Sequence, residues 1–149
     1  MPPRPPRIVE IVLPFPPISL NPYLRTHWAE RYLADKPYRE IVADYLIGVE
    51  PFDRVYLEWE WTFFGTELNF LDRDGENISS VGTKVILDVV KNRVLKDDSN
   101  RYIQNPMLHW WFFDDEKDPE IDGPGEVLLR LSTVPLYGGQ FITLEAEDD

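Results

Sequence analysis

Apolar and polar positions alternate most regularly in the middle of the chain. From Val55 to Phe63 every second residue is apolar, and the residues between them are tyrosine, glutamate or threonine, which is the period-two pattern of a half-buried strand. Shorter β-branched or aromatic runs predict further strands at 8–13, 102–103, 108–113, 127–131 and 141–144. Two longer stretches, 28–47 and 78–92, have helical spacing, and Pro37 predicts a break in the first. This order of elements predicts an α+β fold with a mixed β-sheet and two main helical segments.

The chain divides into a short arm, one domain and a short tail. Residues 1–7 mix proline with arginine and predict a flexible arm, whereas 8–145 contains all the predicted elements. Within that domain 114–126 is an acidic loop, and 146–149 forms an acidic tail. A length of 149 residues is typical of a single domain.

Composition excludes several kinds of site. The chain has no cysteine and two histidines, so disulfides and thiol nucleophiles are excluded and any bound metal is expected to have oxygen ligands. We assign no functional role to His27 or His109, and we expect His109 and the tryptophans of the strands to be packing residues. No apolar run approaches the ~20 residues of a membrane span, and the first residues lack the apolar stretch of a signal peptide. We therefore expect a soluble, cytoplasmic protein.

Charge is unevenly distributed along the chain. A net charge of -12 argues against a nucleic-acid-binding protein, because neutralising phosphates supplies most of the affinity of such proteins. However, the acidic loop and the last five residues hold eleven of the 27 acidic residues and only one of the 15 basic residues. The remainder is nearly neutral and contains a basic cluster within eighteen residues, which comprises Lys84, Lys91, Arg93, Lys96 and Arg101. The sequence therefore allows a local basic face that contacts nucleic acid.

Acidic residues gather at both ends of the second predicted helix. Phosphodiester hydrolysis uses such a group, because carboxylates hold Mg²⁺ or Mn²⁺, which activates a bound water and neutralises charge in the transition state. The alternative is that turns and loops are simply rich in aspartate. The residues concerned are Asp72, Asp74, Glu76, Asp88, Asp97 and Asp98.

The acidic stretch also bears comparison with two other kinds of site. Phe70-Leu-Asp-Arg-Asp-Gly75 resembles the first motif of haloacid-dehalogenase-like phosphatases, in which Asp72 would accept a phosphoryl group and Asp74 would transfer protons. That family needs further motifs on a larger core, and only 77 residues follow Asp72. A calcium-binding EF-hand loop is excluded, because Phe70 and Val81 would occupy ligand positions.

Several separated motifs together resemble the RusA-like family of Holliday-junction resolvases. The first is Leu13-Pro-Phe-Pro-Pro17, followed by Ser19, Asn21, Tyr23 and Arg25. The central block is Arg73-Asp74-x-Glu76-Asn77, then Lys84 and Leu87-Asp88 in a helix, then Asp97-Asp98-Ser99 in a loop. The pair Gly138-Gly139 precedes the last predicted strand. These motifs occur in the order found in the family and span most of the chain.

The resemblance implies a metal-dependent endodeoxyribonuclease that introduces paired nicks into four-way DNA junctions as a homodimer. It implies that Asp74, Glu76 and Asp98 ligate Mg²⁺ or Mn²⁺, that Asp72 is an alternate ligand and Asp97 supports the ligands, and that Lys84 contacts the scissile phosphate. The DNA contacts that it implies, together with the basic cluster, are Asn21, Arg25, Asn77, Lys91, Arg93, Lys96 and Arg101.

Three features of the predicted site keep other interpretations open. Glu76 stands where the family usually has aspartate, and together with the acidic surface it would also suit a non-catalytic, junction-binding member. Lys84 and Asp88 are four residues apart on the predicted helix and would also suit an ordinary surface ion pair. Asn77 would also suit a helix cap.

Overall fold

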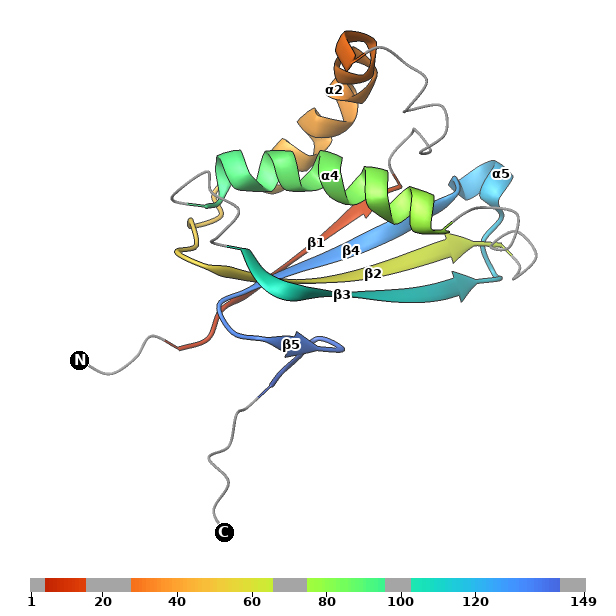
Figure 1. Cartoon of the computed structure of the whole chain (residues 1–149). Helices are drawn as coiled ribbons and strands as arrows, with labels where there is room; N and C mark the ends of the chain where they lie inside the picture. The colour runs from red at the N-terminus through yellow and green to blue at the C-terminus, as the bar shows by residue number, and fades with distance from the viewer. Residues whose placement is uncertain (1–4, 16–27, 66–74, 96–102, 143–149) are drawn as a thin grey trace.

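The structure is a computed structural model of the chain, and it describes residues 5–15, 28–65, 75–95 and 103–142 (Figure 1). Two long helices cover one face of a four-stranded sheet, so the predicted α+β domain with a mixed sheet and two main helices is confirmed. The elements in chain order are β1 (Ile8–Pro14), α2 (Trp28–Tyr45), β2 (Val55–Phe64), α4 (Gly75–Arg93), β3 (Ile103–Asp114), α5 (Pro119–Asp122), β4 (Gly125–Ser132), β5 (Leu136–Tyr137) and β6 (Gln140–Phe141).

The sheet is mixed, and its strand order is β1-β4-β2-β3. β4 pairs antiparallel with both β1 and β2, whereas β2 and β3 are parallel. Parallel neighbours require a connection that returns to the same end of the sheet, and α4 makes this return across the sheet. Within the described residues β3 pairs only with β2, so β3 forms one edge of the sheet.

The period-two pattern of β2 directs its side chains to opposite faces of the sheet. The odd-numbered set faces the helices, and Trp59 and Trp61 in this set are completely buried. They form one core with apolar residues of α4, such as Ile86 and Val90, and with inward residues of β1 and β4. The even-numbered set, which includes Glu58, lies on the face opposite α2 and α4, which we call the open face (Figure 1).

The first helix passes through Pro37, so the predicted break at this residue is wrong. Proline has no N–H to donate to the carbonyl four residues earlier. Pro37 is exposed, however, while Tyr38, Val42 and Leu46 are buried and anchor α2 to the domain. The Tyr38 hydroxyl also donates a 2.8 Å hydrogen bond to the carbonyl of Pro14 in β1, and burial raises the pKa of Tyr38. This packing holds the helix together across the missing hydrogen bond.

The C-terminal part also differs from the prediction. Of the predicted strand 141–144, Phe141 ends a short hairpin formed by β5 and β6, residue 142 is not in a strand, and 143–144 lie outside the described residues. The turn of this hairpin contains Gly138 and Gly139, whose φ angles of 61° and 80° lie in the region that favours glycine. The acidic loop contains α5, whose first turn is capped by the Asp118 side chain. None of the helices in the described ranges is long and apolar enough to cross a membrane.

A buried glutamate attaches the hairpin to the open face. Glu58 is completely buried, and its carboxylate accepts hydrogen bonds from the N–H groups of Gly138 (2.6 Å) and Gly139 (2.8 Å) and from the indole of Trp110 (2.8 Å). The Arg130 guanidinium donates a fourth at 3.0 Å. Burial alone would raise the pKa of Glu58, but the hydrogen bonds and the charge of Arg130 outweigh burial and lower it.

Arg130 lies among three carboxylates, and we call these four residues the Glu58 cluster. Besides Glu58, the guanidinium contacts Glu60 at 2.6 Å and Glu10 at 3.3 Å. Burial disfavours the charged guanidinium, but Glu60 and Glu58 together raise the pKa of Arg130. The Glu58 cluster is therefore a paired set of charges that joins β1, β2, β4 and the hairpin.

His109 and the strand tryptophans act mainly in packing, as predicted. The His109 ring stacks on Trp59 with centroids 5.8 Å apart, and its Nδ1 accepts a 3.0 Å hydrogen bond from the Trp61 indole. Burial lowers the pKa of His109, which favours the neutral ring that this hydrogen bond requires. Trp111, at the β3 edge, stacks on Trp61 and is 36% exposed.

Candidate functional site

α4 connects the two predicted groups of acids. It begins at Gly75, directly after Asp74, and ends at Arg93, shortly before Asp97 and Asp98. Its 19 residues make it about 27 Å long at a rise of about 1.5 Å per residue. In the sequence, the two groups of predicted acids therefore adjoin opposite ends of one helix.

Many of the predicted site residues lie outside the described residues. These are Asp72, Asp74, Asp97 and Asp98 among the predicted acids, and Asn21, Arg25, Lys96 and Arg101 among the predicted DNA contacts. Glu76 and Asn77 lie in the first turn of α4, which begins at Gly75. Lys84, Lys91 and Arg93 lie further along the same helix. The structure thus brings three of the predicted basic residues onto one element.

The described residues alone do not form a metal site. No group of three or more histidine, aspartate or glutamate residues in the described ranges is placed to hold a metal ion. The Glu58 cluster does not serve, because Arg130 pairs with all three of its carboxylates. The predicted ligands at the ends of α4 are carboxylates, the hard oxygen donors that suit Mg²⁺ or Mn²⁺.

Lys84 lies in the middle of α4, and its side chain is exposed. Within the described part of the chain no ion pair joins Lys84 to Asp88, so the predicted alternative of a surface pair does not form. An exposed lysine that is not neutralised by its helical neighbour retains its full attraction for an anion.

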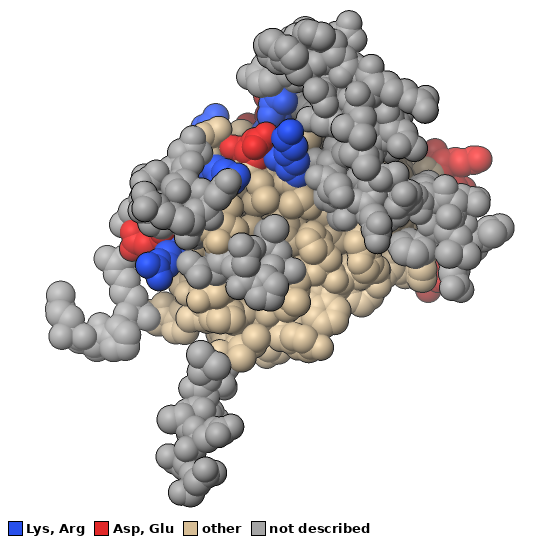
Figure 2. All heavy atoms as spheres, viewed as in Figure 1, with Lys and Arg blue, Asp and Glu red and all other residues tan. Residues whose placement is uncertain are grey.

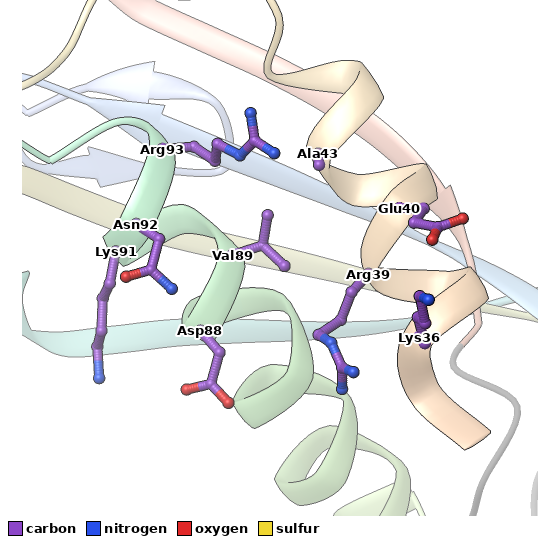
Figure 3. A pocket seen from close by; sticks show the side chains of 9 residues that line it. All are labelled: Lys36, Arg39, Glu40, Ala43, Asp88, Val89, Lys91, Asn92 and Arg93. Atoms are coloured by element: carbon purple, nitrogen blue, oxygen red, sulfur yellow. The ribbon is translucent and has the colours of Figure 1, made fainter. Parts of the chain in front are cut away.

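A groove lies between α2 and α4, and four basic side chains line it. The groove has a volume of about 530 Å³ (Figure 3). We call it the two-helix groove. Its lining residues are Lys36, Arg39, Glu40 and Ala43 from α2, and Asp88, Val89, Lys91, Asn92 and Arg93 from α4.

Two arginines approach the middle of the two-helix groove from opposite walls. Figure 3 shows Arg93 directed from α4 toward α2, beside Ala43. Arg39 extends from α2 toward α4, with Asp88 on the facing helix. Val89 lies between the two arginines along the groove (Figure 3). The groove therefore has cationic groups at two levels and a small apolar floor between them.

The two-helix groove is positive although the chain is strongly negative. Among the described residues, four basic and two acidic side chains line it, which is an excess of two positive charges, whereas the whole chain has a net charge of -12. Figure 2 shows basic atoms, with acidic atoms among them, over the helical layer and an uncharged surface over β3 and the C-terminal hairpin. This local excess attracts anions to the helical layer.

The sequence predicts Lys91 and Arg93 as basic residues of the site, but its motifs do not single out Lys36 and Arg39. The spacing of Lys36, Arg39 and Ala43 places them on one stripe of α2, which was the available signal. Only the packing of α2 beside α4 turns this stripe into the second wall of a groove.

No protein-family model matches the chain, and no curated protein matches it. Function therefore has to be inferred from the chemistry and geometry of its own residues.

Proposed function

We propose that the protein is a metal-dependent endonuclease that nicks branched DNA, in particular four-way junctions, as a homodimer. The observation that carries the proposal is the gathering of cations along α4 and in the two-helix groove, beside the helix that connects two acidic segments. A chain with a net charge of -12 has little general attraction for DNA. A local positive groove would give such a chain a place at which a phosphate backbone can bind.

The proposed roles follow the resemblance to RusA-like resolvases. Asp74, Glu76 and Asp98 provide the carboxylate ligands, and Asp72 and Asp97 lie next to them in the sequence. A bound Mg²⁺ or Mn²⁺ would supply a more acidic water and would neutralise charge on the phosphate. These side chains hold and orient the ion, and the carboxylate of Glu76 is longer than the aspartate usual in the family.

Lys84 is proposed to bind the scissile phosphate. Its place on α4, two turns after Glu76, puts a cation on the helix that carries the first group of acids. A lysine there would stabilise the charge that develops on the phosphate oxygens and would not need to transfer a proton.

The length of α4 supports a site shared between two copies of the chain. Glu76 and Arg93 lie near opposite ends of the helix, about 26 Å apart at a rise of about 1.5 Å per residue. Asp98 follows Arg93 by five residues in the sequence. In the proposed dimer, Glu76 of one copy would share an ion with Asp98 of a second copy.

The edge strand β3 offers a surface on which such a pair could assemble. Residues 103–113 contain no charged side chain, and Phe112 in this stretch is 44% exposed. Long uncharged edge strands are templates for pairing with another strand. Two-fold pairing of β3 with a second copy would set the two α4 helices antiparallel on the same face, with the Gly75 end of one beside the Arg93 end of the other.

The test is cleavage of a labelled synthetic four-way junction by the purified protein in Mg²⁺ and in Mn²⁺, at low salt. We expect symmetric, metal-dependent nicks on the junction and none on a linear duplex, and we expect Asp98→Asn to abolish them. Absence of nicks with either metal would contradict the nuclease proposal. Junction binding without nicks would then point to the non-catalytic, junction-binding alternative.

A further inference from the structure

We infer that the two-helix groove binds the sugar-phosphate backbone of one DNA strand, with Arg39 and Arg93 on different phosphates. The inference rests on the proposed function only for its choice of DNA as the ligand. It adds α2 to the DNA-binding surface and assigns a ligand to Lys36 and Arg39, which none of the sequence motifs contains.

The chemistry of the walls selects a phosphate backbone. Arg39 and Arg93 approach the groove at two levels (Figure 3), and guanidinium groups bind phosphate oxygens with two parallel hydrogen bonds. Asn92, beside Arg93 on α4, adds an amide that can donate hydrogen bonds. Phosphates repeat regularly along a nucleic-acid strand, so two cations at successive levels fit a backbone better than they fit one isolated anion.

The floor of the groove suits the sugar between two phosphates. Val89 lies between the levels of the two arginines, and Ala43 lies beside Arg93 (Figure 3). They offer small apolar surfaces with no hydrogen-bonding group, against which a deoxyribose can pack. A polyanion with charged groups along its whole length, such as an acidic peptide, would leave this middle part of the groove without a matching partner.

The dimensions restrict the groove to one strand. A volume of about 530 Å³ is in the range of small-ligand sites, which is about 300–1,000 Å³. The axes of packed helices are roughly 8–10 Å apart. A whole duplex is too wide to enter between them, because its major groove alone is about 12 Å wide. The backbone that enters can be an unpaired strand at a branch point or one strand of a duplex arm, and both present the same phosphates.

Substitution of Asp88 is expected to change DNA affinity in the direction opposite to substitution of the arginines. Its carboxylate faces Arg39 across the groove (Figure 3), so it repels any phosphate that Arg39 attracts. Removal of this charge should tighten DNA binding, while removal of either arginine should weaken it. A residue that acted only by holding the fold together would not produce gains and losses of this pattern.

The experiment compares Arg39→Gln, Arg93→Gln and Asp88→Asn in the full chain by fluorescence anisotropy at several salt concentrations. The probes are labelled oligothymidylate, a linear duplex and a four-way junction. We expect each arginine variant to bind roughly tenfold more weakly and to lower the salt slope by about one, and we expect Asp88→Asn to bind several-fold more tightly. Arg54→Gln, an exposed arginine outside this groove, is the matched control and should bind as the unaltered protein does.

The three probes identify the source of the backbone. A loss confined to oligothymidylate and the junction assigns the groove to an unpaired strand, and an equal loss on the linear duplex assigns it to a duplex arm. Thermal unfolding of each variant confirms that the fold is retained. If Arg39→Gln and Arg93→Gln bind like Arg54→Gln, the inference is overturned. It is also overturned if labelled polyglutamate binds the groove more tightly than the DNA probes.

The inference and the nuclease proposal fail separately. DNA binding that depends on Arg39 and Arg93 without any nicking would keep the groove and sink the nuclease. Nicking that persists while Arg39→Gln and Arg93→Gln bind DNA as Arg54→Gln does would keep the nuclease and sink the groove.

Discussion

The molecule contains two concentrations of charged side chains, and they differ in burial and in the balance of positive and negative charge. In the Glu58 cluster, both carboxylate oxygens of a completely buried glutamate accept hydrogen bonds, and Arg130 contacts three carboxylates. In the two-helix groove, four basic residues face two acidic ones at the surface. The first lies on the open face and the second on the helical layer.

This difference separates a structural role from a binding role. A buried charge is costly unless its partners are in place, so a satisfied buried cluster fixes geometry and offers little to a ligand. An excess of cations at the surface destabilises the fold only slightly, and it favours the binding of an anion. We therefore expect changes in the Glu58 cluster to alter stability, and changes in the groove or on α4 to alter interaction with DNA.

The largest effect on the fold is expected from Glu58→Ala. The substitution removes one of the carboxylates that balance the charge of Arg130. It also removes the hydrogen-bond acceptor of the Gly138, Gly139 and Trp110 N–H groups. We expect the free energy of unfolding to fall by about 3–5 kcal/mol, measured by chemical denaturation. Glu10→Ala, which removes a half-exposed partner of the same arginine, should cost less than about 1 kcal/mol. Equal losses in the two variants would contradict the structural role of burial.

The second-largest effect is expected from substitution of Lys84, an exposed cation on α4 that we propose binds DNA. Lys84→Ala should slow junction nicking about 100-fold, as expected when one group that stabilises developing charge is lost. Because only one phosphate contact is removed, junction affinity should change far less than the rate, and stability should be unaffected. Single-turnover nicking and anisotropy on the same junction measure the two quantities. A loss of affinity as large as the loss of rate would assign Lys84 to binding alone.

A smaller effect is expected from pH, through Glu58. Its pKa in the folded protein is lowered from the ordinary value of 4.5. At pH values above 4.5 the stabilisation is therefore fully present, and as the pH falls through the lowered pKa it is lost, because the unfolded chain takes up the proton first. The difference in unfolding free energy between the unaltered protein and Glu58→Gln should be constant near neutral pH and shrink below pH 4.5. A difference that grows on acidification would contradict the lowered pKa.

Periodicity predicted the parts of the fold in which one face of an element is buried. β2 and α4 were found within a few residues of their bounds, because alternation in Val55–Phe63 and helical spacing after Ile78 record burial directly. The continuation of helix α2 across Pro37 could not be predicted from the sequence, because it depends on the burial of Tyr38 and its neighbours by the rest of the domain.

The same limit applies to the charged residues. Glu58 alternates with tryptophans in the sequence, a pattern that predicts a solvent-facing glutamate. In the structure the hairpin near the C-terminal end covers Glu58 and buries it. Arg39 lies on an ordinary polar stripe of α2 until α4 packs beside it. The predicted acids followed from local motifs, whereas both charge clusters required contacts between distant segments.

The most direct test of the central claim mixes two inactive proteins. Glu76→Gln and Asp98→Asn are each purified, mixed, allowed to exchange subunits, and incubated with a labelled four-way junction and Mg²⁺ beside the unaltered protein. If the ends of two antiparallel α4 helices build each site, mixed dimers contain one intact site, and random exchange restores about a quarter of all sites. We predict that each variant alone makes no nicks and that the mixture recovers single-strand nicks. A mixture that stays inactive while the unaltered protein cleaves would contradict the shared site.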